Sequence, residues 1–347
     1  MKRIPVSHLM LRFLLLTLLA IPMSACSDWT EEESVEVADP DYGPNYDRYL
    51  AELRAYRSTD HKIVYAWFEN IEQPVSQAHH LTAVPDSVDI INLMTPEIFP
   101  DWQRREMEEV RATKGIRFVY SVSYPELETL YNEAMSAGEI QADGETDPFL
   151  GFATDFLDRK LALFNADGYD GIAVLFNGKK TLHMTEAEKA TYLAREALFM
   201  GRIAAWRAAN PNSLFIFEGK PQNLTDKSIL TETEFIVIRT EGVVYESSLD
   251  YEVMLCIEEG VPTDRFVISA QPKSLDVADT KTGFICNDEN QWVPFLPAAA
   301  EWVATRDSRF AKVGLGVYKI QNDYYYKSQS YINTRVAIGM INPSPKF

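Results

Sequence analysis

One segment of the chain has the layout of a catalytic strand, and it reads Asp-Gly-Tyr-Asp-Gly-Ile-Ala-Val-Leu-Phe-Asn from Asp167 to Asn177. Its apolar run predicts a buried strand. Carboxylates at the end of such a strand could work as an acid, a base or a nucleophile. From Gly171 onward, however, the alternate positions hold Ala173, Leu175 and Asn177, and none of these side chains is a carboxylate. The segment therefore has the form of a catalytic strand without its acids.

The segment resembles the signature of family 18 glycoside hydrolases, the chitinases and endo-β-N-acetylglucosaminidases, in which a barrel strand carries Asp-Gly-x-Asp-x-Asp-x-Glu. Asp170 and Gly171 match its first two residues. Ala173 and Leu175 stand where the second and third aspartates belong, and Asn177 stands where the glutamic acid belongs. On this segment alone, an ordinary buried strand unrelated to that family is the alternative.

The resemblance implies a loss of chemistry. In that family the N-acetyl group of the substrate attacks the anomeric carbon, an aspartate orients this group, and a glutamic acid protonates the leaving oxygen. Asn177 has no titratable proton near neutral pH, so it cannot replace the acid. Loss of a general acid alone costs roughly 10²–10⁴ in rate. The three replacements predict a barrel that holds sugar without cutting it.

Other stretches share the resemblance. Leu53–Phe68 looks like the first helix and strand of a Bacteroidetes endoglycosidase-like branch, and Val84–Asp89 looks like its entry to the second strand. Ser121–Tyr124 reads Ser-Val-Ser-Tyr where active members carry Ser-x-Gly-Gly. Those glycines leave room for the sugar, so this is a second departure near the reaction centre.

The first 25 residues predict a targeting segment. The basic residues Lys2, Arg3 and Arg12 precede the apolar run Phe13–Ile21, which is too short for a stable membrane span. Met23–Cys26 looks like a bacterial lipobox, which implies a lipid on Cys26 that anchors the chain to a membrane. A cleaved signal with an incidental Cys26 is the alternative.

Residues 26–45 predict a disordered acidic tether, since no Lys or Arg occurs between Cys26 and Arg48. An acidic run behind an acylated cysteine resembles the surface-export signal of Bacteroidetes lipoproteins. It implies an outer membrane lipoprotein at the cell surface, with an outer-membrane glycan importer as a possible partner. A periplasm-facing lipoprotein is the alternative.

Charge and composition indicate which classes of ligand the chain does not bind. The formal net charge of −18 disfavours binding to nucleic acid. The histidines show no metal-ligand spacing, and we expect no metal and no cofactor. Cys256 and Cys286 could form a disulfide or remain free thiols.

Residues 46–347 predict a single α/β domain, a (β/α)8 TIM-type barrel, because helical patterns alternate with short apolar runs typical of buried parallel strands. A doubly wound sheet is the alternative. The expected strands are Lys62–Phe68, Val88–Leu93, Ile116–Val122, Gly171–Phe176, Leu214–Phe217, Phe235–Ile238, Phe266–Ala270 and Val313–Tyr318. The expected helices are Tyr46–Tyr56, Pro100–Thr113, Glu126–Ser136, Pro148–Asn165, Glu186–Ala209, Leu249–Glu259 and Pro297–Ala304.

In such a barrel the site lies at the carboxyl ends of the strands. Aromatic rings there could stack on sugar faces, while amides and carboxylates pair with hydroxyls. Arg239 and Glu241 could instead simply pair with each other. Trp292 lies in a long loop, where a further binding ring could occur. The expected sugar-binding residues are Trp67, Phe68, Tyr124, Asn177, Glu218, Arg239, Glu241, Gln271, Tyr318, Asn322 and Tyr324.

Three functions compete at this stage. The first is an inactive glycosidase-like surface lipoprotein that binds glycans containing N-acetylglucosamine, with host N-glycans favoured by the resemblance. The second is an active endo-β-N-acetylglucosaminidase or other glycosidase that uses displaced carboxylates, Glu218 or Glu241. The third is a protein-binding scaffold without sugar affinity.

Overall fold

The computed structural model describes residues 45–141, 147–325 and 329–343. The expected signal peptide (1–25), the lipidation site Cys26 and nearly all of the tether (26–45) lie outside the described residues.

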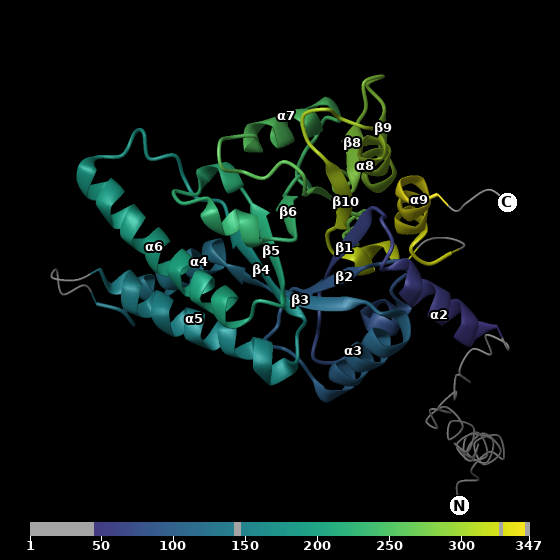
Figure 1. The fold of residues 1–347 in the computed structure, drawn as a ribbon, viewed down its shortest axis with the longest axis horizontal. Helices are drawn as coiled ribbons and strands as arrows, with labels where there is room; N and C mark the ends of the chain where they lie inside the picture. The colour runs from purple at the N-terminus through teal and green to yellow at the C-terminus, as the bar shows by residue number, and fades with distance from the viewer. Residues whose placement is uncertain (1–44, 142–146, 326–328, 344–347) are drawn as a thin grey trace, which may run out of the picture. The chain divides into compact units, whose positions relative to one another are not determined.

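Eight parallel strands form a closed barrel in the order β1-β10-β7-β6-β5-β4-β3-β2, which confirms the TIM-type fold (Figure 1). Closure occurs because β1 pairs with β2 on one side and with β10 on the other. An open doubly wound sheet is thereby excluded. The barrel strands are β1 (Ile63–Phe68), β2 (Ile90–Leu93), β3 (Arg117–Ser123), β4 (Gly171–Phe176), β5 (Leu214–Gly219), β6 (Phe235–Ile238), β7 (Phe266–Ala270) and β10 (Lys312–Val317).

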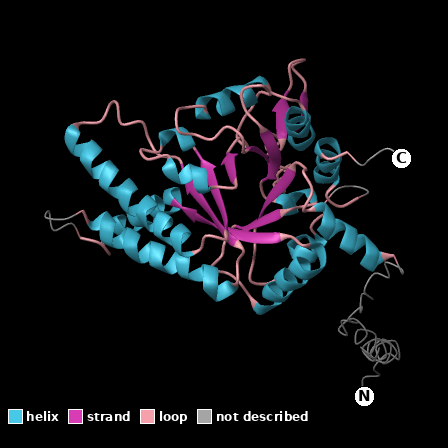
Figure 2. Cartoon of the chain, viewed as in Figure 1, coloured by secondary structure: helices cyan, strands magenta, loops and turns pink. Residues whose placement is uncertain are grey.

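Helices surround the strands on the outside (Figure 2). Seven agree closely with the expected segments, and α6 begins with a capping box in which Thr185 and Glu188 bond each other's backbone N–H. The helix α9 was not expected. The helices are α2 (Tyr46–Tyr56), α3 (Asp101–Lys114), α4 (Tyr124–Ser136), α5 (Pro148–Asp167), α6 (Glu186–Ala209), α7 (Ser247–Cys256), α8 (Phe295–Ala304) and α9 (Ile332–Ile341).

The strands bury both of their faces, as parallel barrel strands must. Successive residues alternate between two separate apolar clusters. Tyr65, Trp67 and Ala173 belong to the cluster inside the barrel. Phe68 and Phe176 belong to the larger cluster between the strands and the helices.

The long loop after β7 contains a hairpin that the sequence did not predict. Its strands β8 (Phe284–Cys286) and β9 (Trp292–Pro294) have three residues each, too few for a periodic signal. Cys256 and Cys286 are both buried free thiols, so the open question of their pairing is answered.

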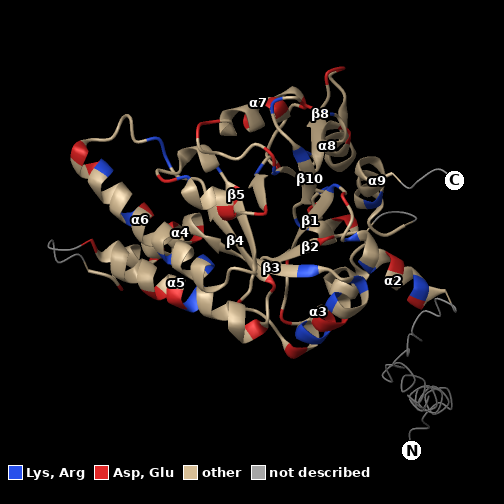
Figure 3. Cartoon of the chain, viewed as in Figure 1, with Lys and Arg blue, Asp and Glu red and all other residues tan. Residues whose placement is uncertain are grey.

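Charged side chains lie mainly on the helices and loops, and the barrel strands carry few (Figure 3). Within the described ranges, no helix is long and apolar enough to cross a membrane. The same residues contain no group of His, Cys, Asp or Glu arranged to hold a metal ion.

Candidate functional site

The centre of the barrel is occupied by the carboxylate of Glu218, near the carboxyl end of β5. Its side chain is 0% exposed. The Tyr65 hydroxyl donates to Glu218 Oε1 at 2.6 Å, and Asn92 Nδ2 donates to the same oxygen at 3.0 Å. Trp67 Nε1 lies 3.3 Å from Oε2 as a further donor. Side chains from β1 and β2 therefore converge on one buried acid of β5.

Arg239, which directly follows β6, covers this acid. Its Nη1 donates to Glu218 Oε2 at 3.2 Å, and its Nη2 forms an ion pair with Glu241 Oε1 at 2.5 Å. The guanidinium lies between two rings, with its Cζ 4.7 Å from the centroid of Trp67 and 4.8 Å from that of Tyr318. We use the name Arg239 cluster for five residues: Trp67, Glu218, Arg239, Glu241 and Tyr318.

The cluster sets the protonation of its members. Burial raises the pKa of the Glu218 carboxyl. Arg239 and the neutral donors stabilise the anion and so oppose part of this rise in pKa. Burial also opposes ionisation of Glu241, but the charge of Arg239 and hydrogen bonds from Arg239 and Ser269 hold its pKa below the usual value. Glu241 is thus kept as an anion rather than as a proton donor.

The positions of the expected catalytic motif lie on β4 beside this cluster. Ala173 is buried inside the barrel, and Asn177 is exposed just beyond the strand. Leu175 is the register partner of Glu218 on β5, so their side chains share the inner face. A carboxylate is therefore present one strand away from a position where the signature has an aspartate.

Asp170 has a structural task outside the barrel interior. Its Oδ2 accepts from the backbone N–H of Phe118 at 2.7 Å and from Arg111 Nε at 3.2 Å. The first aspartate of the signature thus joins β4 to β3 and α3, which gives it a structural role.

Both displaced carboxylates are held by donors of the protein itself. Glu218 is enclosed by donors and has no exposed surface from which a substrate oxygen could be protonated. Glu241 is paired with Arg239 and accepts from the Ser269 hydroxyl. The Arg239 cluster thus pairs the charge of one guanidinium with two carboxylates.

Phe68 and Tyr124, two of the expected sugar-binding residues, are buried in the cluster between the strands and the helices. Phe68 follows the inward Trp67, so strand alternation turns it into the cluster beneath the helices. Tyr124 is buried at the start of α4, where its ring packs edge-on against Phe176 and Phe199 at 5.1 Å. Phe68 is therefore turned away from the barrel rim, whereas Tyr124, although largely buried, lines the cavity between α4 and α6.

The other rim residues are spread around the barrel. Gln271 lies beside the Arg239 cluster, since its Nε2 donates to the backbone oxygen of Glu241 at 2.7 Å. Asn177 and the half-buried Asn322 lie in the loops after β4 and β10. Tyr324 packs edge-on against the buried Tyr331 at 5.4 Å, on the helix side. Within the predicted set, the structure brings together the Arg239 cluster and Gln271.

Tyr65, Asn92 and Ser269 belong to the same network and were missed. Asn92 Nδ2 donates to the Tyr65 hydroxyl at 2.6 Å, and the backbone N–H of Thr240 donates to Ser269 Oγ at 2.7 Å. A signal existed for Asn92, because a lone amide inside the apolar run Ile-Ile-Asn-Leu must find a partner when buried.

Two cavities open among the loops at the carboxyl ends of the strands. One of about 350 Å³ lies between the loops after β7 and β10, where Gln271 and Tyr325 line it. The other, of about 570 Å³, lies between α4 and α6 and is lined by Lys179 and His183 from the loop after β4.

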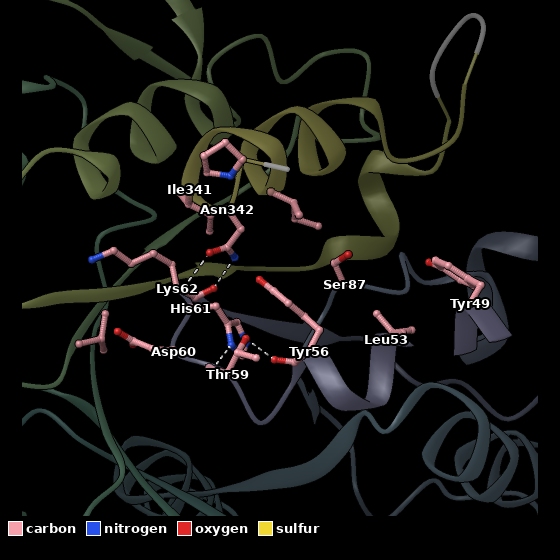
Figure 4. A pocket seen from close by; sticks show the side chains of 13 residues that line it. Tyr49, Leu53, Tyr56, Thr59, Asp60, His61, Lys62, Ser87, Ile341 and Asn342 are labelled. Atoms are coloured by element: carbon pink, nitrogen blue, oxygen red, sulfur yellow. Dashed lines mark hydrogen bonds between the residues drawn. The ribbon is translucent and has the colours of Figure 1, made fainter. Parts of the chain in front are cut away.

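A cavity of about 770 Å³ lies at the opposite, amino end of the barrel (Figure 4). His61 and Lys62 line it together with Asn342 after α9, whose amide bonds the backbone of Lys62 (Figure 4). His61 Nε2 also lies 3.0 Å from Asp89 Oδ1. Because barrel enzymes react at the carboxyl end, we assign this face to stability.

Comparison with known proteins points to one family. Residues 30–340 match the family described as "Glycoside hydrolase family 18, BT1044-like". Comparison with curated protein sequences gives no match at all. Among the solved structures that are similar, the three described next have sequence identities that establish the fold alone.

The first structure is a variant of BT1044, with a TM-score of 0.59, 16% identity, and coverage of 88% of this chain and 95% of that chain. An endo-β-N-acetylglucosaminidase from Cordyceps militaris has a TM-score of 0.57 and 17% identity, with 85% and 96% covered. Human YKL-39, described as a pseudo-chitinase with retained chitooligosaccharide binding properties, has a TM-score of 0.52 and 10% identity, with 81% and 98% covered.

Proposed function

Because this chain belongs to glycoside hydrolase family 18, in its BT1044-like branch, we propose that it binds glycans containing N-acetylglucosamine and does not hydrolyse them. One observation carries the proposal. On β4, Ala173, Leu175 and the following Asn177 occupy the places where the family signature has carboxyl groups. Without an acid at these places, the substrate-assisted reaction lacks its proton donor.

The arrangement of the nearby acids supports binding over turnover. Glu218 is fully buried under Arg239, and Glu241 is held as an anion by the same guanidinium. A general acid needs a proton and a path to the leaving oxygen. Neither glutamate offers both, so we do not favour the alternative of a displaced catalytic pair.

Two relatives support the choice of ligand. Human YKL-39 is described as a pseudo-chitinase that retains chitooligosaccharide binding, so the fold supports binding without hydrolysis in that protein. A Cordyceps militaris endo-β-N-acetylglucosaminidase mutant, with a TM-score of 0.53, is described in complex with fucosyl-N-acetylglucosamine-Asn. We extend this chemistry to the present chain and propose N-glycans as its ligands.

The leader supports a proposed location. Met23–Cys26 resembles a lipobox, and the acidic residues behind it resemble a surface-export signal. We propose a lipoprotein on the outer membrane surface that passes captured glycan to an importer. Fatty-acid labelling of the native chain, with none in Cys26→Ala, is the expected result, and equal labelling of both would refute the anchor.

Calorimetric titration with a high-mannose N-glycan tests the central proposal. We expect a saturating isotherm, with intact glycan recovered afterwards and identified by mass spectrometry. Continuous heat that scales with protein concentration, together with cleaved glycan, would show turnover and overturn the proposal. The absence of any heat or product would favour the scaffold function instead.

A further inference from the structure

An isolated parallel bridge joins the loop after β6 to the two-stranded β8–β9 hairpin in the loop after β7. The backbone N–H of Cys286 donates to the oxygen of Val244 at 2.8 Å, and that of Glu246 donates to the oxygen of Cys286 at 3.0 Å. Tyr245 is thereby paired with Cys286, which is paired in turn with Trp292 across the hairpin. Register partners project their side chains to the same face.

This row forms an aromatic surface that faces solvent. Tyr245 and Trp292 are each 56% exposed, whereas Cys286 between them is only 7% exposed. Adjacent strands lie about 4.8 Å apart, so the two rings stand on strands separated by roughly 10 Å. Ile285, on the opposite face, is fully buried. On this face the two exposed rings thus stand on either side of a small, largely buried side chain, and we take them to shield it.

The same face continues into the cavity of about 350 Å³. Phe284 and Pro294 lie two residues along from Cys286 and Trp292, and they line the cavity. The volume falls within the usual range for small-ligand pockets, about 300–1,000 Å³. The remaining lining residues are Gln271, Pro272, Lys273, Gly283, Phe295, Leu296, Tyr325 and Asn333.

Polar groups of this cavity are fixed in place. Gln271 Nε2 donates to the backbone oxygen of Glu241, and among the described residues no group donates to Gln271 Oε1. Asn333 Nδ2 donates to Asp323 Oδ1 at 2.8 Å. Gly283 has φ +83°, and a Cβ there would lie 2.3 Å from the backbone nitrogen of Lys273. The hairpin is therefore packed directly against the loop that carries Gln271.

We propose that this surface, the hairpin face (Tyr245, Phe284, Trp292, Pro294 and the adjoining cavity with Gln271), binds consecutive pyranose rings of a neutral oligosaccharide. Aromatic rings suit the C–H faces of sugars, and oriented amides suit their hydroxyls.

The proposal rests on the proposed glycan-binding function and gives it a location. The Arg239 cluster fills the barrel axis with its own side chains, and its charges are satisfied within the protein. The hairpin face instead offers exposed rings and an open cavity beside that axis. We therefore place the sugar contacts on the loops after β6, β7 and β10.

The test is calorimetric titration of the full chain with triacetylchitotriose and with a high-mannose N-glycan. Trp292→Ala and Tyr245→Ala should each raise Kd about tenfold or more, as loss of a central aromatic contact does. Trp292→Phe should retain most of the affinity. Tyr251→Ala is the matched control, because Tyr251 is an exposed aromatic residue on α7 outside the hairpin face.

The outcomes separate the two proposals. Native binding that persists in Trp292→Ala and Tyr245→Ala, both with unchanged circular dichroism, would overturn the hairpin face and leave the glycan-binding function standing. A native chain that binds neither sugar would overturn both. Alkylation of Cys286, read by peptide mass spectrometry, gives an independent check. It should be faster in Trp292→Ala than in the native chain, and an equal rate would contradict the shielding of Cys286.

Discussion

At the scale of single residues, the barrel retains the parts of the family signature that hold the fold. Asp170 bonds the backbone of β3, while Ala173 and Leu175 fill space inside the barrel. Glu218 is the register partner of Leu175, but its carboxylate points into a network of donors. Under the proposed function, this carboxylate has no catalytic role, because a general acid needs a proton and access to the leaving oxygen.

Restoring one acid should not restore hydrolysis. Asn177→Glu returns a general acid to its place, yet Ala173 and Leu175 still provide no carboxylate to orient and stabilise the reacting acetamido group. We expect no reducing-end release from a high-mannose N-glycan by chromatography. Measurable turnover from this single change would show that the other two positions are dispensable.

Breaking the central ion pair should destabilise the barrel. Arg239→Met keeps an apolar chain between Trp67 and Tyr318 but leaves Glu218 buried without its cation. The expected loss in the free energy of unfolding is about 3–5 kcal/mol, measured by urea denaturation. Arg309→Met, which removes an exposed partner of Asp307, is the control and should leave the midpoint nearly unchanged. A similar small effect of both would mean that the cluster is not a stabilising unit.

At the scale of elements, the glycine of the signature has a packing role. β4 and β5 lie so close at Gly171 that a Cβ on this residue would stand 1.9 Å from the backbone oxygen of Leu214. No side chain can yield there, since the obstacle is backbone. The Asp-Gly pair thus serves the barrel wall independently of the chemistry further along β4.

Gly171→Ala should therefore be strongly destabilising, by about 3 kcal/mol or more, because β5 must shift to admit the methyl group. Thermal and urea unfolding would measure it. Gly151→Ala on α5 is the matched control, since a Cβ there meets nothing within 4 Å. That control should be stabilising by about 0.5–1 kcal/mol. Equal behaviour of the two variants would contradict the close strand contact.

Elements with a long periodic pattern could be predicted from the sequence, and short ones could not. α2 and α6 have the expected bounds, because apolar spacing and the Thr185 cap define them locally. The strands β8 and β9 were not predicted, because each has only three residues and is held by pairing with the other strand or with Tyr245. The hairpin face could not be predicted either, because it depends on the same pairing. Only Trp292 was noted in advance, as a residue of a long loop.

At the scale of the whole molecule, the two ends of the barrel have different tasks. The carboxyl end carries the Arg239 cluster and the hairpin face, and the amino end has a network of buried polar contacts beside its cavity. There His61 Nε2 pairs with Asp89, whose Oδ1 also binds Arg57 Nη1 at 2.7 Å. Asp89 Oδ2 accepts from the backbone N–H of Val64 at 2.8 Å, which ties this network to β1.

The amino end should make stability depend on pH. The hydrogen bond to Asp89 raises the pKa of His61, with a smaller opposing effect of burial. A raised pKa means that the contribution of His61 is fully present below its ordinary value of 6.5 and is lost as pH rises through the folded-state value. His61→Gln should thus cost more stability at about pH 5.5 than at about pH 8.5. Urea unfolding at both pH values would measure it, and an equal cost at both would contradict the charged pairing.

The sequence by itself determined the barrel, its eight strands and the loss of the acids on β4. These are local properties, because the apolar pattern of a strand and the residue types at fixed spacing can be read from consecutive residues. Tertiary structure alone decided that Trp67 faces inward while Phe68 faces the helices, and that Arg239 closes over Glu218. It also decided that Tyr245 joins Trp292 in one surface. Contacts between residues far apart in the chain depend on register and closure, which no local pattern encodes.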